Sequence, residues 1–293
     1  MKLIKQSFEI LDQQCGLEGI YKQIEISGRT CYKSEDKITE DSAKEFVDRM
    51  IKSGHGAMLE HGTVYLAMPV ETMLPIEANG WGKYTKNPYS KGFRVCDVNG
   101  QKRVAITTNL RVLVENGWLD DLQYICEPTE YHEKRITVKF ITDQGILREF
   151  TRHRVFSFAV ESTRYCNYTK DKFSNEITFI QPNWISDEDV KDYHINYNYF
   201  IDQDNNHITA VNRFMSALKN AEYFYMELIK LGWKPQQARN ILPLATKCDM
   251  IMTGFISDWK HFFELRDATS AHPQAQELAH SLHEAFIQRG LVE

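Results

Sequence analysis

The stretch TRHRVFSFAVESTRYCNY, Thr151–Tyr168, gathers three arginines, a histidine, several hydroxyl side chains and one carboxylate into a short segment. Arginine stays charged at any working pH, and its planar guanidinium matches the oxygens of a phosphate or a carboxylate. Only Glu149 and Glu161 lie nearby in the sequence, so local carboxylates cannot pair with all three arginines. We therefore expect this segment to bind an anion such as a nucleotide phosphate or a diphosphate cofactor. The competing interpretation is a solvated basic face, or arginines paired with distant acids.

The composition limits the classes of protein to which this chain can belong. It has 293 residues, of which 42% are hydrophobic and 26% charged, as in ordinary soluble globular proteins. The formal charge of −5 argues against general binding to nucleic acids or anionic membranes, so anion binding should be local. The six cysteines are scattered without a C-x-x-C pair, which indicates neither a disulfide framework nor a zinc site. The beginning does not resemble a signal peptide, and no apolar run approaches about 18 residues, so we expect a cytoplasmic protein.

Hydrophobic periodicity predicts both helices and strands. Residues 40–56 have the pattern of an amphipathic helix that ends at Gly54, whereas residues 63–70 and 135–142 alternate as strands do. Asp143 is placed to cap a short helix that leads directly into the arginine-rich stretch. Further helices, with plausible starts or glycine stops, are expected over residues 207–233, 257–268 and 273–290.

These elements indicate an α+β fold with a mixed sheet flanked by helices and a helix-rich C-terminal half. No internal repeat occurs, and the length allows one large domain or two small ones, with an insertion expected at about 78–134. The opening of this insertion is rich in glycine, asparagine and lysine, and it is expected to be irregular.

The spacing within the arginine-rich stretch is specific. Residues 152–164 match the pattern R-H-R-x-x-S-x-x-x-x-S-x-R at all six fixed positions, and such a match is rare by chance. This pattern resembles the signature of the flavin-dependent thymidylate synthases. Four further segments resemble elements of that family and occur in the family's order: GRTCY (28–32), SGHGAMLEH (53–61), QQARNILPLAT (236–246) and FFELRDATSAHPQAQEL (262–278).

The resemblance covers most of the chain outside the insertion, and it implies a single domain over residues 1–293, an activity and an assembly. The chain would methylate dUMP to dTMP with 5,10-methylenetetrahydrofolate as carbon donor, FAD as hydride carrier and NADPH as the reductant of FAD. It would release tetrahydrofolate, and it would form a homotetramer with oligomeric active sites where subunits meet. Cationic residues on several separate segments agree with sites to which neighbouring chains contribute.

The resemblance also implies roles for individual residues. The flavin would be bound by His55, Glu60, Arg152, His153, Arg154 and His261. The substrate dUMP would be bound by Glu149, Glu161, Ser162, Thr163, Arg164 and Arg239. Arg266 would lie against the uracil ring as the catalytic residue, because a nearby positive charge stabilises the ionised pyrimidine and so raises electron density at C5.

The chain departs from the family pattern at several of these positions. The family commonly has Asn-Glu where this chain has Ala159-Val160, and Glu161 follows one place later. Either Glu161 supplies that carboxylate from a shifted position, or the contact is absent. Glu149 replaces a common glutamine and is expected to face the uracil edge, since an acid would repel the phosphate. Phe255 and His261 replace family asparagines near the flavin.

Other chemistries are less consistent with the sequence. His55, Glu60 and His61 lack a third ligand at a metal-binding spacing, so no metal site is expected. No cysteine has the context of a nucleophile, and Ser162 lacks a catalytic-triad order, so it is expected to bind rather than react. Neither a G-x-G-x-x-G nor a P-loop motif occurs. The alternatives are a metal-dependent nucleotide phosphohydrolase and a non-catalytic nucleic-acid-binding module.

Overall fold

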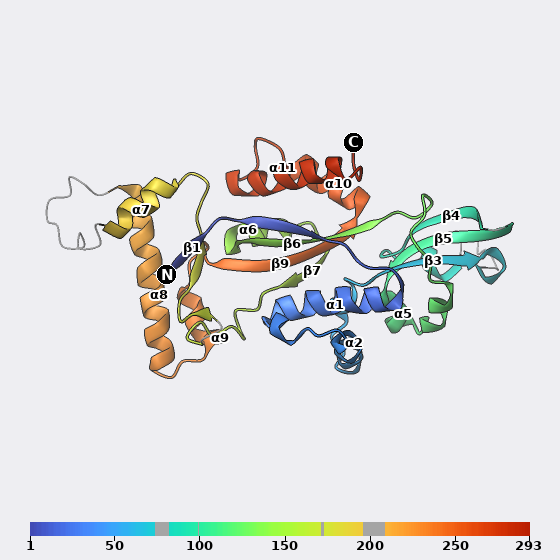
Figure 1. Ribbon diagram of the computed structural model, residues 1–293, viewed down its shortest axis with the longest axis horizontal. Coiled ribbons are helices and arrows are strands. Elements are labelled where there is room, and N and C mark those ends of the chain that lie inside the picture. Colours follow the sequence, from blue (N-terminus) through green and yellow to red (C-terminus); the bar gives the residue numbers. More distant parts are fainter. Residues whose placement is uncertain (74–81, 99, 171–172, 196–208) are drawn as a thin grey trace.

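A computed structural model describes residues 1–73, 82–98, 100–170, 173–195 and 209–293 (Figure 1). The chain combines helices with three sheets, which confirms the predicted mixture of α and β structure. The central sheet has the order β2-β6-β9-β7. Its strands are β2 (Ser7–Leu11), β6 (Arg135–Asp143), β7 (Ser157–Val160) and β9 (Lys247–Phe255). All three pairings are antiparallel, so the prediction of a mixed sheet is wrong for this sheet.

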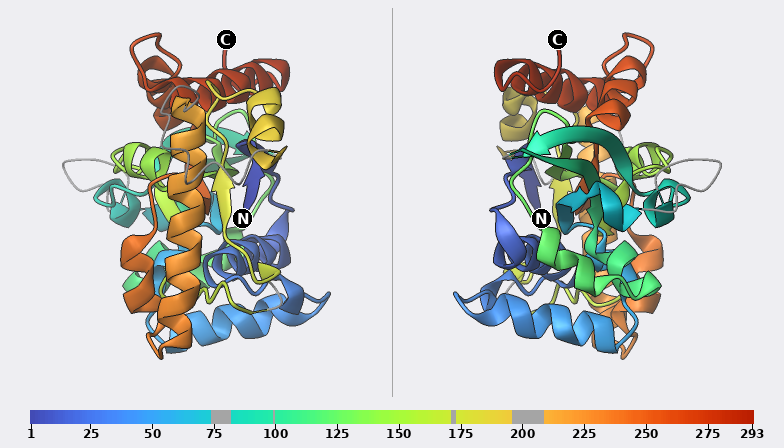
Figure 2. Two further views of the ribbon diagram at one scale, coloured as in Figure 1. Left: turned by 90° about the vertical axis from the view of Figure 1, so that its left-hand side faces the viewer. Right: turned by 90° about the vertical axis from the view of Figure 1, so that its right-hand side faces the viewer.

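Helices cover both faces of the central sheet (Figures 1 and 2). On one face lie α1 (Gly16–Tyr32), α2 (Ser42–Lys52) and α3 (Gly56–Leu59). On the other face lie α6 (Gln144–Phe150), α10 (Ile256–Arg266) and α11 (Pro273–Gln288). Because strand side chains alternate, Ile251 of β9 joins the α1-side core, whereas Met250 and Met252 join the α10-side core.

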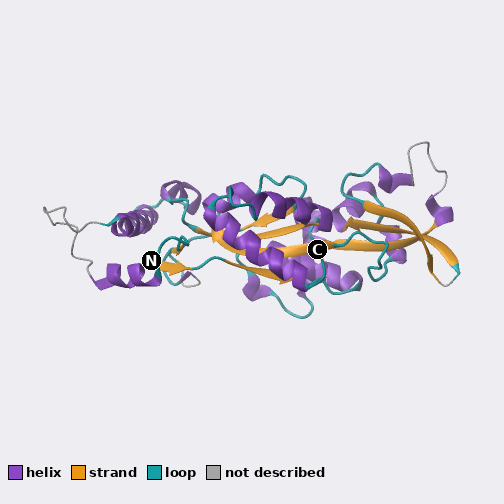
Figure 3. Cartoon of the chain, turned by 90° about the horizontal axis from the view of Figure 1, so that it is seen from above, coloured by secondary structure: helices purple, strands orange, loops and turns teal. Residues whose placement is uncertain are grey.

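A second antiparallel sheet, in the order β3-β5-β4, lies at one end of the elongated molecule (Figure 3). Its strands are β3 (Thr63–Pro69), β4 (Lys91–Val98) and β5 (Gln101–Asn109). The helices of this region are α4 (Gly82–Thr85), α5 (Leu110–Asn116) and the 3₁₀ segments η2 (Val70–Met73) and η3 (Leu119–Tyr124).

This sheet corrects the prediction of an irregular opening for the insertion at 78–134. Residues 91–98 form an edge strand whose pairing with β5 shifts register at Gly92, where φ is +113°. Glycine adopts that conformation without strain, so a residue that suggested a loop instead marks a bulge in a strand. Residues 78–81 and 99 lie outside the described residues, and the insertion as a separate unit stays a prediction.

The opposite end of the molecule carries a parallel pair of short strands and the longest helix of the described chain (Figure 1). The elements there are β1 (Lys2–Ile4), β8 (Thr178–Ile180), α7 (Asp187–Ile195), α8 (Ala210–Lys230), α9 (Pro235–Ala238) and η7 (Arg239–Ile241). Helix α8 confirms the helix predicted over 207–233; its cap is Thr209, and residues 207–208 lie outside the described residues. Pro235 occupies the first turn of α9, where a missing N–H costs nothing.

The remaining predicted helices are confirmed with small shifts at their ends. Helix α10 begins at Ile256 rather than Ser257, because Phe255 N donates to the Asp258 carboxylate (3.1 Å). Helix α11 begins at Pro273 as predicted. The short 3₁₀ segment η1 (Glu35–Lys37) links α1 to α2.

Candidate active site

The arginine-rich stretch follows α6, and the sequence fixes that helix at both ends. Asp143 Oδ1 accepts a hydrogen bond from Ile146 N (2.8 Å), which is the predicted N-terminal cap. Phe150 at the other end is fully buried between Phe140 and Phe262. The chain then turns out of the core and enters the edge strand β7, which leaves Arg152 and Arg154 exposed on either side of the buried His153.

Arg266, at the C-terminal end of α10, is the centre of the first group of predicted site residues. Its Nε donates to Nε2 of His153 (3.0 Å), Nη1 donates to Oε2 of Glu149 (2.8 Å), and Nη2 donates to the Glu149 carbonyl (2.8 Å). These bonds use three of the five N–H groups of the guanidinium, so two N–H groups remain to contact a ligand. We call Glu149, His153, His261 and Arg266 the Arg266 cluster.

His153 is the buried member of this cluster. Burial, together with the charge of Arg266 and the neighbouring His261, lowers the pKa of His153 to about 4. The ring is therefore neutral near pH 7 and can accept the hydrogen bond from Arg266. Its edge also packs against Phe262 (5.1 Å between ring centroids), whereas His261 stays exposed. In this geometry His153 holds Arg266 in place, and direct contact between His153 and a flavin stays a prediction.

The second group lies beyond β7, and we call Ser162, Thr163, Arg164 and Arg239 the Arg239 cluster. Nη1 of Arg239 donates to the Thr163 hydroxyl (3.0 Å), which joins two segments that are 76 residues apart. Ser162 N donates to the carbonyl of Cys31 at the end of α1 (3.0 Å). The Arg239 cluster thus presents two arginines and two hydroxyls together, a donor set that suits a phosphate.

His55 lies next to this cluster through a chain of rings. The Arg164 guanidinium lies over the Tyr165 ring (5.4 Å), and the rings of Tyr165 and Tyr32 are 6.1 Å apart. The Tyr32 hydroxyl in turn lies 3.3 Å from Nδ1 of His55. The GRTCY and SGHGAMLEH segments therefore meet the arginine-rich stretch here, as expected for parts of one site.

Glu60 and His61 are occupied by structural contacts. The Glu60 carboxylate pairs with Arg111 of α5, and its carbonyl accepts from Arg135 (2.9 Å). His61 is fully buried with Nδ1 2.8 Å from the Thr253 hydroxyl, and burial lowers its pKa to about 3. Among the described residues, no group of three or more potential ligands could hold a metal ion.

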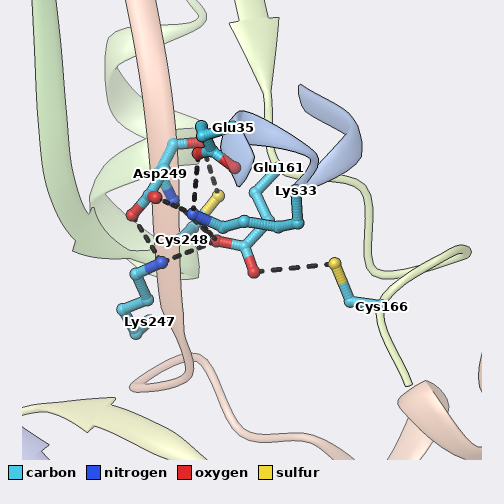
Figure 4. A network of polar contacts seen from close by, with 7 residues as sticks. All are labelled: Lys33, Glu35, Glu161, Cys166, Lys247, Cys248 and Asp249. Carbon is cyan, nitrogen blue, oxygen red and sulfur yellow. Dashed lines mark hydrogen bonds and ion pairs between the residues drawn. The ribbon is translucent and has the colours of Figure 1, made fainter. Parts of the chain in front are cut away.

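Glu161 does not point toward the Arg239 cluster. Its carboxylate is buried in a network with Lys33, Lys247 and Asp249, in which both ammonium groups point toward the two carboxylates (Figure 4). Sequence reasoning missed both lysines. The position of Glu161, one place beyond the carboxylate of the family pattern, did indicate an altered role. The local sequence could not show its partners, because Lys247 and Lys33 lie 86 and 128 positions away.

The two clusters lie on opposite sides of the central sheet. His153 and Arg266 pack with Phe262 on the side of α10, whereas Glu161, next to Ser162, pairs with Lys33 at the end of α1. The four-stranded sheet separates these layers (Figure 1). Among the described residues, no hydrogen bond, ion pair or ring contact joins the Arg266 cluster to the Arg239 cluster within one chain.

Comparison with known proteins gives a family match. The sequence model described as "Thymidylate synthase complementing protein" matches residues 128–289, more than half of the chain. The "Probable flavin-dependent thymidylate synthase" of Paramecium bursaria Chlorella virus 1 is 27% identical over 152 residues, which cover 52% of this chain and 66% of that protein. The "Flavin-dependent thymidylate synthase" of Halobacterium salinarum is 25% identical over 174 residues, covering 55% and 65%. The chain thus spans just under two thirds of the length of these relatives.

Among solved structures, a UMP/dUMP methylase PolB from Streptomyces cacaoi bound with 5-Br dUMP aligns with a TM-score of 0.44 and 15% identity. The alignment covers 98% of this chain and 93% of that one. Within the described residues, no helix has both the length and the apolar character needed to cross a membrane.

Proposed function

Because this chain belongs to the thymidylate synthase complementing protein family, as its resemblance to the flavin-dependent thymidylate synthases predicts, we propose that it methylates dUMP to dTMP. The carbon donor in this proposal is 5,10-methylenetetrahydrofolate, FAD is the hydride carrier and NADPH is the reductant. The observation that carries the proposal is the family match over residues 128–289, which contains the whole arginine-rich stretch together with Arg239 and Arg266.

The exposed arginines fit the diphosphate of FAD. Arg152 and Arg154 are exposed, and neither makes an ion pair with any residue in the described part of the chain. Two such guanidiniums, two residues apart, suit two neighbouring phosphates. When bound, FAD supplies the hydride chemistry, and the protein supplies binding and orientation.

The Arg239 cluster fits the phosphate of dUMP. Arg239 is already held by Thr163, and Arg164 is flanked by Tyr165, so neither side chain needs to be ordered from a fully mobile state. Ser162 is held by its main-chain bond to Cys31 and can donate its hydroxyl. In this proposal Ser162, Thr163, Arg164 and Arg239 bind the nucleotide.

Arg266 is the proposed catalytic residue. Its hydrogen bonds to His153 and Glu149 fix the guanidinium plane, and its two remaining N–H groups can face a pyrimidine edge. A positive charge beside N3–H favours loss of that proton, which raises electron density at C5. Glu149 offsets part of this charge, and it also gives the site an acceptor for the proton or an N–H of the base.

We propose a homotetramer in which one subunit supplies the Arg266 cluster and another supplies the Arg239 cluster. The separation of the clusters by the central sheet supports this arrangement, because a site that contains both needs a second copy. Large apolar side chains also remain exposed on and after α8, as expected of a surface that another subunit covers. They are Tyr223, Phe224, Leu231 and Trp233.

The direct test is turnover by the purified protein supplied with dUMP, methylenetetrahydrofolate, FAD and NADPH. We expect dTMP and tetrahydrofolate as products. Arg266→Ala is expected to retain flavin but lose methylation, whereas Arg289→Ala, which removes an exposed arginine paired with Asp12, should keep both. Release of inorganic phosphate from dUMP with Mg²⁺, without dTMP, would instead indicate a phosphohydrolase.

A further inference from the structure

The buried network at the end of β7 has a composition that the family pattern does not predict. It contains Lys33, Glu161, Lys247 and Asp249, and we call it the lysine–carboxylate network (Figure 4). Nζ of Lys247 lies 2.8 Å from Glu161 Oε2 and 2.5 Å from Asp249 Oδ1. Nζ of Lys33 contacts Asp249 and lies 3.7 Å from Glu161 Oε2. Both carboxylates are at most 4% exposed, and the lysines are 15–16% exposed.

Two largely buried cations thus face two buried anions, and Lys33 also pairs with the partly exposed Glu35 (3.6 Å). Buried charges are tolerated only when they are paired and hydrogen-bonded, so each member depends on the others. Although burial opposes both shifts, the carboxylates raise the pKa of Lys33 and the lysines lower the pKa of Asp249, so the charged forms of these two groups are favoured. Lys33 also adopts φ +49°, a conformation that favours glycine, at the C-cap of α1, where its N–H donates to the carbonyl of Thr30 (3.3 Å).

The network joins the segments that carry the proposed nucleotide ligands. Glu161 directly precedes Ser162, and its backbone N donates to the carbonyl of Asp249 (2.8 Å) while its carboxylate accepts from Asp249 N (3.1 Å). Lys33 directly follows Tyr32, the residue next to His55. Lys247 begins the strand reached from Arg239 through residues 240–246.

We propose that Lys33 and Lys247 are positioning residues for nucleotide binding: they hold Glu161 inward so that Ser162, Thr163 and Arg164 face the phosphate beside Arg239. The inference rests on the proposed function, which it deepens. Ala159 and Val160 cannot supply the carboxylate that the family commonly has there. The carboxylate of Glu161, one place later, pairs with Lys33 and Lys247, so in this chain it has a structural task. Neither lysine touches the nucleotide in this account, and their effect passes through the backbone of residues 161–164.

The test measures KM for dUMP, kcat, flavin content and thermal stability in Lys247→Met, Lys247→Arg and Lys44→Met. Lys247→Met leaves Glu161 and Asp249 with Lys33, which also pairs with Glu35, and we expect KM for dUMP to rise about tenfold or more while kcat stays within about threefold. Flavin content should not change, because Arg152 and Arg154, the proposed flavin ligands, precede β7, whereas the network lies at its other end. Lys247→Arg keeps the charge and should restore KM to within about threefold of wild type. Lys44→Met, which removes an exposed lysine paired with Asp48 on α2, should match wild type.

Lys33→Met provides a second variant with the same expected rise in KM, should Lys247→Met fold poorly. Unchanged KM for dUMP in the folded lysine variants would overturn the inference and leave the proposed function intact. Loss of flavin and kcat together with the rise in KM would also overturn it, since that result indicates general unfolding. A wild-type protein that neither methylates nor binds dUMP would contradict the proposed function itself, and the inference with it.

Discussion

At the scale of single residues, His153, which holds the proposed catalytic arginine, makes the stability of the fold depend on pH. The folded protein holds this imidazole neutral, with a pKa of about 4 instead of 6.5, because the ring is buried beside Arg266. An unfolded chain takes up a proton below pH 6.5, whereas the folded chain does so only near pH 4. The contribution of neutral His153 to the free energy of unfolding is therefore fully present above pH 6.5. It is lost as the pH falls from 6.5 to 4, and the loss levels off below pH 4.

We predict that His153 alone accounts for about 2 kcal/mol of lost stability between pH 7 and pH 5. Urea unfolding of wild type and of His153→Gln at both pH values measures this, since glutamine can accept from Arg266 but does not titrate. The fall in unfolding free energy should be smaller by that amount in the variant. His61 is shifted in the same direction and remains in both proteins, so it cancels. An equal pH dependence in the two proteins would contradict the account of His153.

Site residues that belong to a short sequence motif could be predicted. Residues whose role depends on partners far away in the sequence were missed. The arginine pattern located Arg152, Arg154 and Arg164. The structure links Arg164 to His55 through two tyrosine rings and places it in one turn with Thr163, the partner of Arg239. Lys33 and Lys247 carry no local mark, because their partners come from other strands. Whether each predicted ligand touches FAD or dUMP stays a prediction.

At the scale of elements, the crossing of α1 and α2 depends on Gly28. A Cβ at this position would lie 2.7 Å from Cε1 of Phe46 and closer still to its Cζ, so the two helices approach too closely for a methyl group. We predict that Gly28→Ala lowers the free energy of unfolding by about 1–3 kcal/mol, because the buried Phe46 ring must shift.

Denaturant unfolding of Gly28→Ala, with and without Phe46→Leu, separates overpacking from other causes. Phe46→Leu removes the ring atoms that the new methyl group would meet, so the double variant should lose less than the sum of the two single losses. Strictly additive losses would show that Gly28 and Phe46 do not compete for the same space.

Elements with a strong local signal were predictable, and those set by long-range pairing were not. Asp143 caps α6 through its side chain, and Gly54, with φ +72°, directly follows the C-cap of α2, both as predicted. The antiparallel order β2-β6-β9-β7 pairs residues 90–134 positions apart, and periodicity does not show such pairing. Strand β4 was missed because its segment is rich in glycine, asparagine and lysine, which suggested an irregular structure.

At the scale of the whole molecule, the proposed site is shared between subunits. Suppose that the Arg266 cluster of one chain and the Arg239 cluster of another form one site. Arg164→Ala then damages only the Arg239 cluster, and Arg266→Ala damages only the Arg266 cluster. We predict that each variant alone is nearly inactive, whereas co-assembled mixtures regain activity about tenfold or more above either parent, because some sites pair two intact surfaces.

The control for this mixing combines the Arg164→Ala and Arg239→Ala variants, whose changes lie in one cluster; this mixture should complement poorly, since every copy of that cluster is damaged. Co-expression, or dissociation and reassembly, followed by a dTMP assay measures the effect. Mixtures that stay as inactive as their parents, although shown by mass to contain both variants, would indicate that each site is built within one chain.

The central claim is that arginines from separate segments hold a flavin diphosphate and dUMP side by side, and a visible absorption spectrum tests it most directly. We predict that the purified protein binds FAD and shows a flavin band that shifts when dUMP is added but not when inorganic phosphate is added, because the uracil ring must change the surroundings of the flavin. Protein that remains colourless after incubation with FAD, or a flavin band that does not respond to saturating dUMP, would contradict the account.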